Sequence, residues 1–373
     1  MIEYLYNFSI SLVAFLVVLS VLVYVHELGH YLAARQCGVR VEIFSIGFGP
    51  EICGRTASNG TRWKFSAVPF GGYVKMFGEQ APIDGREAEQ VNASDIKESF
   101  YNKPLRQRAW IVFAGPLANF IFAILILGGL FVALGEPHTP PSISTVQSGS
   151  AAERGGLKPG DVFLKIDGEK ISRFEELRRL VQLSPNRELS ILIKRDDRTI
   201  RLSVTPDAVE ETRFGTSRLV GRLGVGRGTS DLTFVKYDPF TAIYKASIQT
   251  AKMARDMLVA VGEIIFGERT AKELGGPIKI AQISGEMAQA GLVMLIQFAA
   301  ILSINLGLIN LFPIPLLDGG HLMFYLVEGV RRKPVGQKAM TVSLNIGLIL
   351  ILALTIFVTW NDLVQSSLGR LFQ

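Results

Sequence analysis

Cysteine, histidine and basic residues near the N-terminus are scarce in this chain of 373 residues. Each shortage restricts the kinds of metal site or targeting segment that the chain can contain. The two cysteines, Cys37 and Cys53, lie in no metal-ligand spacing, and both fall on the side predicted to be cytoplasmic, where thiols stay reduced. No lysine or arginine precedes Arg35, so the first apolar run lacks the basic start of a cleaved signal peptide. We therefore expect a retained membrane span. No basic patch interleaved with aromatic residues indicates nucleic acid as a partner.

Two of the four histidines stand in the sequence His26-Glu27-Leu28-Gly29-His30 at the end of that run. Histidines four apart on a helix project from one face, which suits two ligands of one zinc ion. Glu27 follows the first ligand directly and can act as general base on a water molecule. Charged and titratable residues are costly inside a membrane, so this cluster indicates a zinc hydrolase site in a span.

Long apolar runs dominate the composition, which is 49% hydrophobic with a mean hydropathy of +0.32. Four runs without a charged residue are long enough to cross a bilayer: residues 8–25, 109–134, 292–311 and 341–360. Basic residues near span ends favour an N-terminus outside the cell. In that topology the inner flanks hold Arg35, Arg40, Lys97, Lys103, Arg106, Arg108, Arg331, Arg332, Lys333 and Lys338, and the outer flanks hold Arg154, Lys272, Lys279 and Arg370.

Residues 38–76 read as a short sheet, rich in aromatic side chains, between the first two spans. Residues 62–67 and 71–77 flank residues 68–72, which look like a hairpin turn. We expect this sheet to dip into the membrane interface and its edge to pair with an extended peptide. The alternative is a structural sheet that packs against the spans. Residues 81–99 are polar and acidic and read as a cytoplasmic loop. In the second span, Asn119 can hydrogen-bond across helices, which we interpret as packing.

From residue 137 the composition becomes that of a soluble domain. We expect strands at residues 143–147 and 162–166, a short helix at 149–157, an amphipathic helix at 174–183, and a hairpin from 189–194 and 199–204. Tight turns carry Gly156, Leu157, Gly160 and Asp161. This order of elements resembles a PDZ domain of the bacterial permuted type, which would capture a peptide end or strand. The alternative is a steric gate that binds no peptide. Residues 207–236 read as irregular around a short strand at 223–225, and residues 239–266 read as an amphipathic helix.

The third span ends in Asn310-Leu311-Phe312-Pro313-Ile314-Pro315-Leu316-Leu317-Asp318-Gly319-Gly320-His321. Prolines two residues apart cannot continue a helix, so this segment is extended or kinked. Spans one and three run in the same direction, which places Asp318 level with His26 and His30 as the third zinc ligand. His321 is the rival ligand. Asn310 could donate to a carbonyl oxyanion or a substrate backbone, or could only bridge helices.

The motifs around His26–His30, Gly47-Phe48-Gly49, residues 113–120 and residues 310–320 together resemble the site-2 protease family, in order over nearly the whole chain. The resemblance is strongest to the bacterial regulator-of-sigma-E-protease group, although this chain has room for one PDZ domain rather than two. It implies intramembrane zinc proteolysis of single-span proteins, such as membrane-tethered anti-sigma factors trimmed by an upstream site-1-type protease, and remnant signal peptides. It also implies one Zn²⁺ per chain and substrate contacts from Asn310, Pro313, Pro315, Gly47, Phe48, Gly49, Phe70, Gly71 and Gly72.

The predicted fold is a polytopic α-helical membrane protein with four transmembrane helices, a membrane-reentrant β-hairpin, and an α+β PDZ domain inserted between spans two and three. We expect spans one and two in residues 1–136, the PDZ domain in 137–207, a linker with an amphipathic helix in 208–291, and spans three and four in 292–373. The expected location is the bacterial inner membrane, as a monomer, with the N-terminus and PDZ domain outside and the active site near the cytoplasm. Two alternatives are a zinc membrane enzyme acting on lipid-modified protein ends and a membrane adaptor with a PDZ domain.

Overall fold

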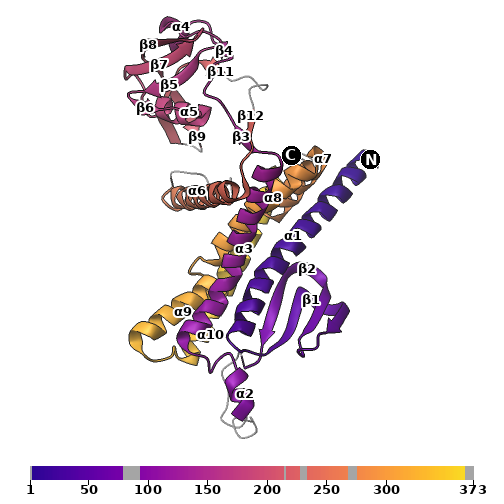
Figure 1. Ribbon diagram of the computed structural model, residues 1–373. Coiled ribbons are helices and arrows are strands. Elements are labelled where there is room, and N and C mark those ends of the chain that lie inside the picture. Colours follow the sequence, from indigo (N-terminus) through magenta and orange to yellow (C-terminus); the bar gives the residue numbers. More distant parts are fainter. Residues whose placement is uncertain (1, 79–92, 214–215, 227–232, 268–274, 366–373) are drawn as a thin grey trace. The chain divides into compact units, whose positions relative to one another are not determined.

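The computed structural model describes residues 2–78, 93–213, 216–226, 233–267 and 275–365 (Figure 1). The chain forms two compact units. The helical unit comprises residues 1–127, 245–257 and 272–373, and the sheet unit comprises residues 128–244 and 258–271. Most of the predicted loop 81–99 lies outside the described residues, and its later part contains a short helix, α2 (Ala93–Glu98).

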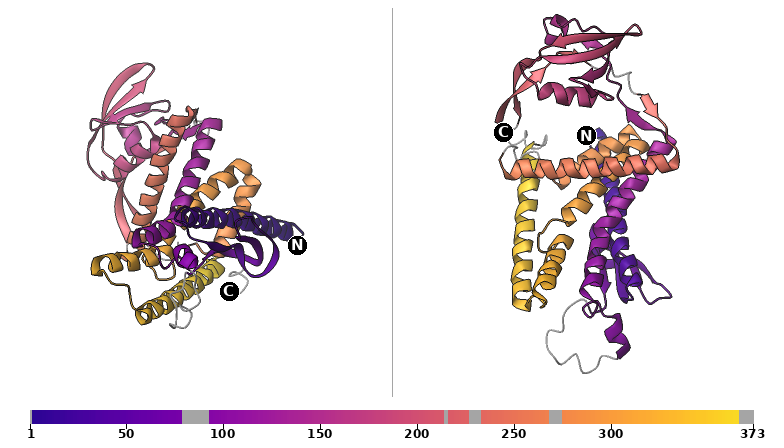
Figure 2. Two further views of the ribbon diagram at one scale, coloured as in Figure 1. Left: turned by 60° about the horizontal axis from the view of Figure 1, so that its bottom comes forward. Right: turned by 60° about the vertical axis from the view of Figure 1, so that its left-hand side comes forward.

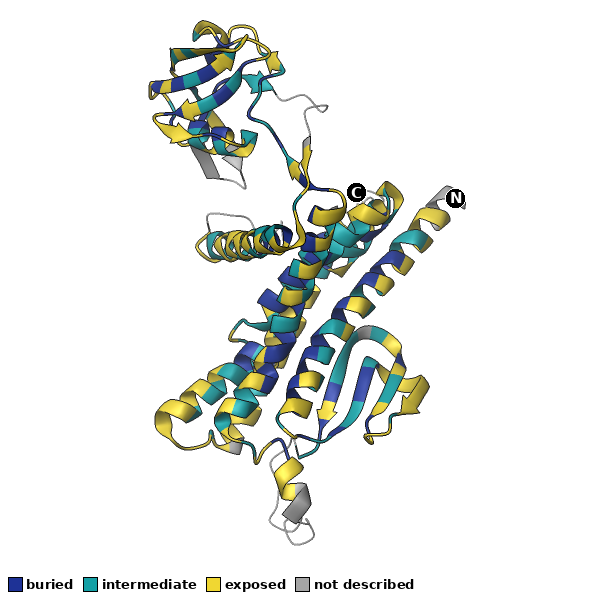
Figure 3. Ribbon diagram, in the orientation of Figure 1, coloured by how far each residue is buried: buried dark blue, intermediate teal, exposed yellow. Residues whose placement is uncertain are grey.

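Four long apolar helices correspond to the four predicted spans: α1 (Ile2–Gln36), α3 (Leu105–Ala133), α8 (Leu292–Asn310) and α10 (Gln337–Gln365). Each is long and apolar enough to cross a membrane. Their apolar residues are not confined to one face, as expected for helices surrounded by lipid and protein. Many of the large apolar side chains on α10 are exposed. By contrast, α3 carries a longer buried stripe, which is dark blue in Figure 3. Figure 2 shows the long helices from two further directions. The chain is a multi-pass membrane protein.

Glycines let α1 and α3 approach each other closely. A Cβ atom added at Gly29 of α1 would lie 2.3 Å from the carbonyl oxygen of Ala114 and 2.7 Å from Cβ of Ala118, both in α3. No larger residue fits at Gly29 without separating the two helices. The helix that carries the two histidines is therefore held against the second span at backbone distance.

Strands β1 (Val41–Thr56) and β2 (Arg62–Met76) form one sheet beside α1. Phe44 of β1 lies opposite both Val74 and Trp63, so β2 turns back within residues 66–71 and its two parts lie on either side of residues 43–46 of β1. The later part of β1, residues 51–56, pairs with the other edge of residues 62–66. The predicted turn is confirmed, but the prediction that its flanks pair with each other is wrong. Insertion of β1 between them buries Phe44, whose ring stacks on Trp63 at 4.2 Å between centroids.

A helix absent from our sequence prediction, α7 (Pro277–Ala290), packs along α1. A Cβ atom at Gly285 would lie 2.7 Å from Cβ of Ser11, so this contact is also close. Asp362 of α10 holds the start of α7, because its carboxylate accepts hydrogen bonds from the backbone N–H groups of Gly276 (2.9 Å) and Lys279 (3.0 Å).

The sheet unit contains a four-stranded sheet in the order β6-β5-β7-β8. Its strands are β5 (Val162–Ile166), β6 (Glu169–Lys170), β7 (Leu189–Arg195) and β8 (Arg198–Val204), and helices α4 (Ala151–Arg154) and α5 (Phe174–Gln182) complete the predicted order. The buried core includes Phe163, Leu177 and Ile191. The turn between β7 and β8 is formed by Asp196 and Asp197, both with positive φ.

Asp161 is fully buried at the edge of this core. Its carboxylate accepts hydrogen bonds from Nε and Nη2 of Arg195 at 2.6 and 2.7 Å and from the backbone N–H of Lys158 at 2.8 Å. The hydrogen bond to Asp161 raises the pKa of Arg195. Asp161 is therefore a paired buried charge that fixes the turn before β5.

The prediction that residues 207–236 are irregular is wrong. They contain the hairpin β9 (Asp207–Arg213) and β10 (Thr216–Arg222), and the short strands β11 (Val225–Gly226) and β12 (Thr233–Val235). β11 pairs with β4 (Thr145–Val146), and β12 pairs with β3 (Glu136–His138). These partners are about 80–100 residues distant, so local sequence does not reveal the pairing. The amphipathic helix α6 (Pro239–Ile265) follows, with Asp238 as its N-cap.

Candidate metal centre

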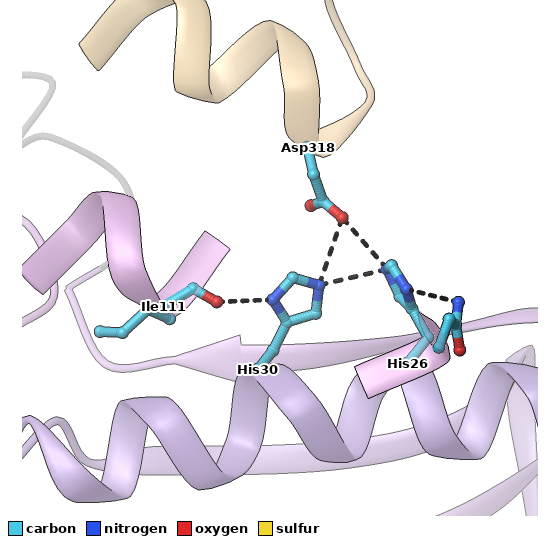
Figure 4. A network of polar contacts seen from close by, with 5 residues as sticks. His26, His30, Ile111 and Asp318 are labelled. Carbon is cyan, nitrogen blue, oxygen red and sulfur yellow. Dashed lines mark hydrogen bonds and ion pairs between the residues drawn. The ribbon is translucent and has the colours of Figure 1, made fainter. Parts of the chain in front are cut away.

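His26 and His30 lie on one face of α1, as their spacing predicts, and both side chains are buried. Their Nε2 atoms are 3.2 Å apart. Asp318, the first residue of α9 (Asp318–Arg331), completes a triangle (Figure 4). Its Oδ2 atom lies 3.2 Å from Nε2 of His26 and 3.5 Å from Nε2 of His30. Residues nearly 300 positions apart in the sequence thus converge on one point.

These three atoms fit the ligand set of a zinc ion. Ligands about 2.0–2.1 Å from a tetrahedral zinc are about 3.3–3.4 Å from each other, which is close to the distances found here. Asp318 Oδ2 is buried and makes no hydrogen bond, which is costly for a carboxylate that has no cation to bind. Two imidazoles and one carboxylate are also a common donor set of catalytic zinc, which leaves a position for water.

The opposite nitrogens of both rings contact α3. Nδ1 of His30 donates to the backbone carbonyl of Ile111 at 2.9 Å, so Nε2 is left without a proton and can bind a metal. Nδ1 of His26 lies 3.2 Å from Nδ2 of Asn119. The second span therefore orients both histidines of the first.

The segment between α8 and α9 places Asp318. It contains Pro313 and Pro315, and Leu316 has a φ of 93°, which is strained for a leucine. Gly319 and Gly320 allow this segment to fold tightly onto α9. A Cβ atom at Gly319 would lie 2.3 Å from the carbonyl oxygens of Leu311 and Phe312, and one at Gly320 would lie 2.4 Å from that of Ile314. The extended or kinked segment predicted from the two prolines is confirmed.

Comparison with known proteins agrees with this geometry. The profile of Peptidase family M50 matches residues 14–354. The chain is 41% identical to "Putative zinc metalloprotease Atu1380" of Agrobacterium fabrum over 96% of both chains. It is 36% identical to "Metalloprotease MmpA" of Caulobacter vibrioides, over 98% of this chain and 99% of the relative.

The chain is a member of peptidase family M50. It is a zinc-dependent metalloprotease, and the resemblance to site-2 proteases is confirmed.

In this M50 peptidase, Glu27 lies on α1 between the two histidines and is 9% exposed. The backbone of β2 passes directly over it. A Cβ atom at Gly72 would lie 3.1 Å from Cγ of Glu27, 2.7 Å from Val23 and 2.7 Å from the carbonyl oxygen of Ser45. Of the predicted substrate-binding residues, Gly72 is therefore in contact with the candidate base.

The remaining predicted residues of the β1–β2 sheet gather around Phe48. Gly47 and Gly49 have φ values of 89° and 83°, which favour glycine. Phe48 is 45% exposed and stacks on Tyr73, and a Cβ atom at Gly71 would lie 2.7 Å from its ring. Phe70 lies in β2, but its side chain is outside the described part of the chain.

On the other side of the centre, Asn310 is the last residue of α8, and Pro313 and Pro315 lie in the segment leading to Asp318. Pro315 packs against α10, because a Cβ atom at Gly347 would lie 1.9 Å from its carbonyl oxygen. His321, the rival ligand, lies one turn into α9 with its ring near Phe324. Among the described residues, the group of potential ligands within 4.8 Å of each other is His26, His30 and Asp318.

The sheet unit contains a groove of about 750 Å³. It runs between α5, β11 and the β9–β10 hairpin, and is lined by residues such as Val146, Leu177, Val181, Val209, Leu223 and Val225. The turn residues predicted from sequence do not line it: Leu157 is in the core, Asp161 pairs with Arg195, and Gly156 and Gly160 form turns with positive φ. The sequence Leu223-Gly224-Val225, which we predicted only as a strand, contributes to the groove.

Proposed function

We propose that this protein is an intramembrane peptidase with His26, His30 and Asp318 as the ligands of one zinc ion and Glu27 as the general base. The observation that carries the proposal is the convergence of these ligand atoms from α1 and from the segment that follows α8. Both α1 and α8 are candidate membrane spans. A ligand set built from the ends of two spans acts on peptide bonds that are themselves in or near the membrane.

The chemistry follows from the side chains. A zinc ion bound by the three residues would supply Lewis acidity, which polarises a peptide carbonyl and makes water acidic enough to lose a proton near neutral pH. Glu27 accepts a proton from the attacking water as the water oxygen bonds to the carbonyl carbon. Glu27 then passes that proton to the nitrogen as the C–N bond breaks. Asn310 donates to the carbonyl oxygen as negative charge develops on it.

The substrate has to be extended at the cut. A helical segment hides its carbonyls in hydrogen bonds, and an edge of the β1–β2 sheet offers alternative partners for its backbone. Gly72 supports this role because it sets β2 against Glu27. Gly47, Phe48, Gly49, Phe70 and Gly71 shape the same sheet, which we propose is membrane-reentrant, and Pro313 and Pro315 keep the opposite wall non-helical.

The substrates proposed are single-span membrane proteins, namely anti-sigma factors already trimmed by an upstream site-1-type protease and remnant signal peptides. We assign residues 137–207 to a PDZ domain that admits substrates lacking a bulky outer domain. The groove bordered by β11 and α5 fits an extended peptide and supports this assignment. We propose that the protein acts as a monomer in the bacterial inner membrane. The sheet unit would lie outside and the metal centre near the cytoplasm, an orientation that agrees with the distribution of basic residues.

Reconstituted protein tests the substrate class. Liposomes would contain the peptidase and a single-span substrate, either with a folded outer domain or with that domain removed, and mass spectrometry would locate the cut. The proposal predicts a cut within the span and faster cleavage of the trimmed substrate. Cleavage only near a lipid-modified terminus of a prenylated peptide would favour the alternative lipid-substrate enzyme, and binding without cleavage would favour the adaptor.

A further inference from the structure

The amide nitrogen of Asn119, and not its oxygen, faces Nδ1 of His26. This orientation does not suit a His26 that binds a metal. If Nε2 of His26 binds a metal, Nε2 carries no proton and the proton of the neutral ring is on Nδ1. That N–H is buried and requires an acceptor. The group 3.2 Å from it is Nδ2 of Asn119, which is itself a donor. Two donors would face each other.

A second observation also indicates that the oxygen of the Asn119 carboxamide should face His26. Oδ1 of Asn119 is buried and has no hydrogen-bond partner. Half a turn of the carboxamide exchanges its oxygen and nitrogen, which have nearly the same shape. Oδ1 then accepts from Nδ1–H of His26, so one rotation removes both the donor–donor contact and the unpaired oxygen.

Asn119 is held firmly enough to orient the ring. It is fully buried, and its backbone carbonyl accepts a hydrogen bond from Oγ of Ser303 in α8 at 2.8 Å. A Cβ atom at Gly307 of α8 would lie 3.2 Å from Cβ of Asn119, so little space is left for the side chain to move. Helices α1, α3 and α8 therefore meet at this residue.

We propose that Asn119 is a positioning residue for the metal. Its Oδ1 accepts from Nδ1 of His26, which fixes the ring orientation and leaves Nε2 free of a proton. The backbone carbonyl of Ile111 does the same for His30. Asn119 is therefore more than the packing residue that we predicted from the sequence, and its role rests on the proposed zinc ligands. Partners of this kind typically change metal affinity by about 10- to 100-fold.

Zinc affinity, measured by chelator competition on the purified full chain, tests the role without any assay of cleavage. Asn119→Leu removes the acceptor at nearly constant volume and is expected to weaken zinc binding by about 10- to 100-fold. Asn119→Asp keeps an acceptor on Nδ1 and is expected to restore the affinity. Ser284→Ala is the control, because it removes a buried serine hydroxyl whose hydrogen bond, to the carbonyl of Ile280, stays within α7, and zinc affinity is expected to equal that of wild type.

Unchanged affinity in Asn119→Leu, or equal losses in Asn119→Leu and Asn119→Asp, would overturn the proposal. A loss in Ser284→Ala as large as that in Asn119→Leu would do the same, because the loss would then follow from removing any buried polar group rather than the acceptor for His26. His26→Ala tests the proposed zinc ligands separately from the role of Asn119. Retention of zinc in this variant would refute the proposed metal centre itself.

A measurement on the unmutated protein remains available if Asn119→Leu does not fold. The chain contains four histidines, so ¹⁵N-histidine labelling gives a simple spectrum. In the zinc-loaded protein, Nδ1 of His26 is expected to be protonated. An unprotonated Nδ1, or coordination through Nδ1, would overturn the proposal.

Discussion

Gly115 of α3 lies directly against the imidazole of His30: an added Cβ atom would be 2.2 Å from Nε2, the nitrogen that faces Asp318. The metal centre thus depends on the absence of a side chain in the neighbouring helix. Gly29 of α1 also lacks a side chain where the two helices meet, and this close contact brings α1 near enough for α3 to orient both histidines.

Gly115→Ala is therefore expected to displace His30 and weaken zinc binding at least tenfold, since a methyl group and a ring nitrogen cannot share that space. Zinc content after dialysis against a weak chelator is the measurement. Gly129→Ala in the same helix is the matched control, because a Cβ atom there meets nothing within 4 Å. Zinc retention in both variants would show that the contact has no influence on the centre.

Substitutions can decide whether Asp318 or His321 is the third zinc ligand. Asp318→Ala removes the carboxylate from the triangle and is expected to reduce bound zinc from one equivalent per chain to a small fraction. His321→Ala is expected to retain zinc, because the described ligand atoms that converge within 4.8 Å belong to His26, His30 and Asp318. Metal analysis of both purified variants gives the answer, and the opposite pattern would make His321 the ligand.

In the sheet unit, Arg195→Leu leaves the buried carboxylate of Asp161 without its charged partner. Breaking such a pair costs about 3–5 kcal/mol, so hydrogen exchange in β5 and β7 of the full chain is expected to accelerate strongly. Lys194→Ala is the control, because its ion pair with Asp197 is exposed to solvent and contributes little to stability. Similar exchange in both variants would contradict a structural role for Asp161.

The start of α7 depends on one carboxylate of α10. Asp362→Leu removes the acceptor for two N–H groups and is expected to destabilise the first turn of α7 by about 1–2 kcal/mol, seen as faster amide exchange there. Thr355→Ala is the control in the same helix, since its hydroxyl donates to the carbonyl of Ile351 within α10 itself. Unchanged exchange in Asp362→Leu would show that packing on α1 alone holds α7.

Features set by local spacing were predictable from the sequence. The apolar runs gave the four spans, and two histidines four residues apart share a helix face. Asp318 followed from a topological argument, because spans one and three run in the same direction. Most strands and helices from residue 145 to 204 were also predictable, since turn residues and periodicity mark them, but the two-residue strand β6 was not predicted.

Features set by contacts between distant residues were not predictable. Residues 43–46 of β1 lie between the two parts of β2, where both of their edges have backbone partners, and a local sequence pattern does not reveal this pairing. The β9–β10 hairpin and α7 have mixed composition and weak periodicity. Asn119 was noticed only as a polar residue in a span, because its unpaired oxygen and its distance to His26 exist only in the fold.

Glu27→Gln separates the role of Glu27 as general base from metal binding by His26, His30 and Asp318. Wild type and variant, purified in detergent, would be compared for zinc content and for cleavage of a single-span substrate. The proposed mechanism predicts equal zinc in both, a cut within the span by wild type, and a loss of at least about a hundredfold in the variant, because glutamine cannot accept the proton. Equal cleavage by two zinc-loaded proteins would contradict it.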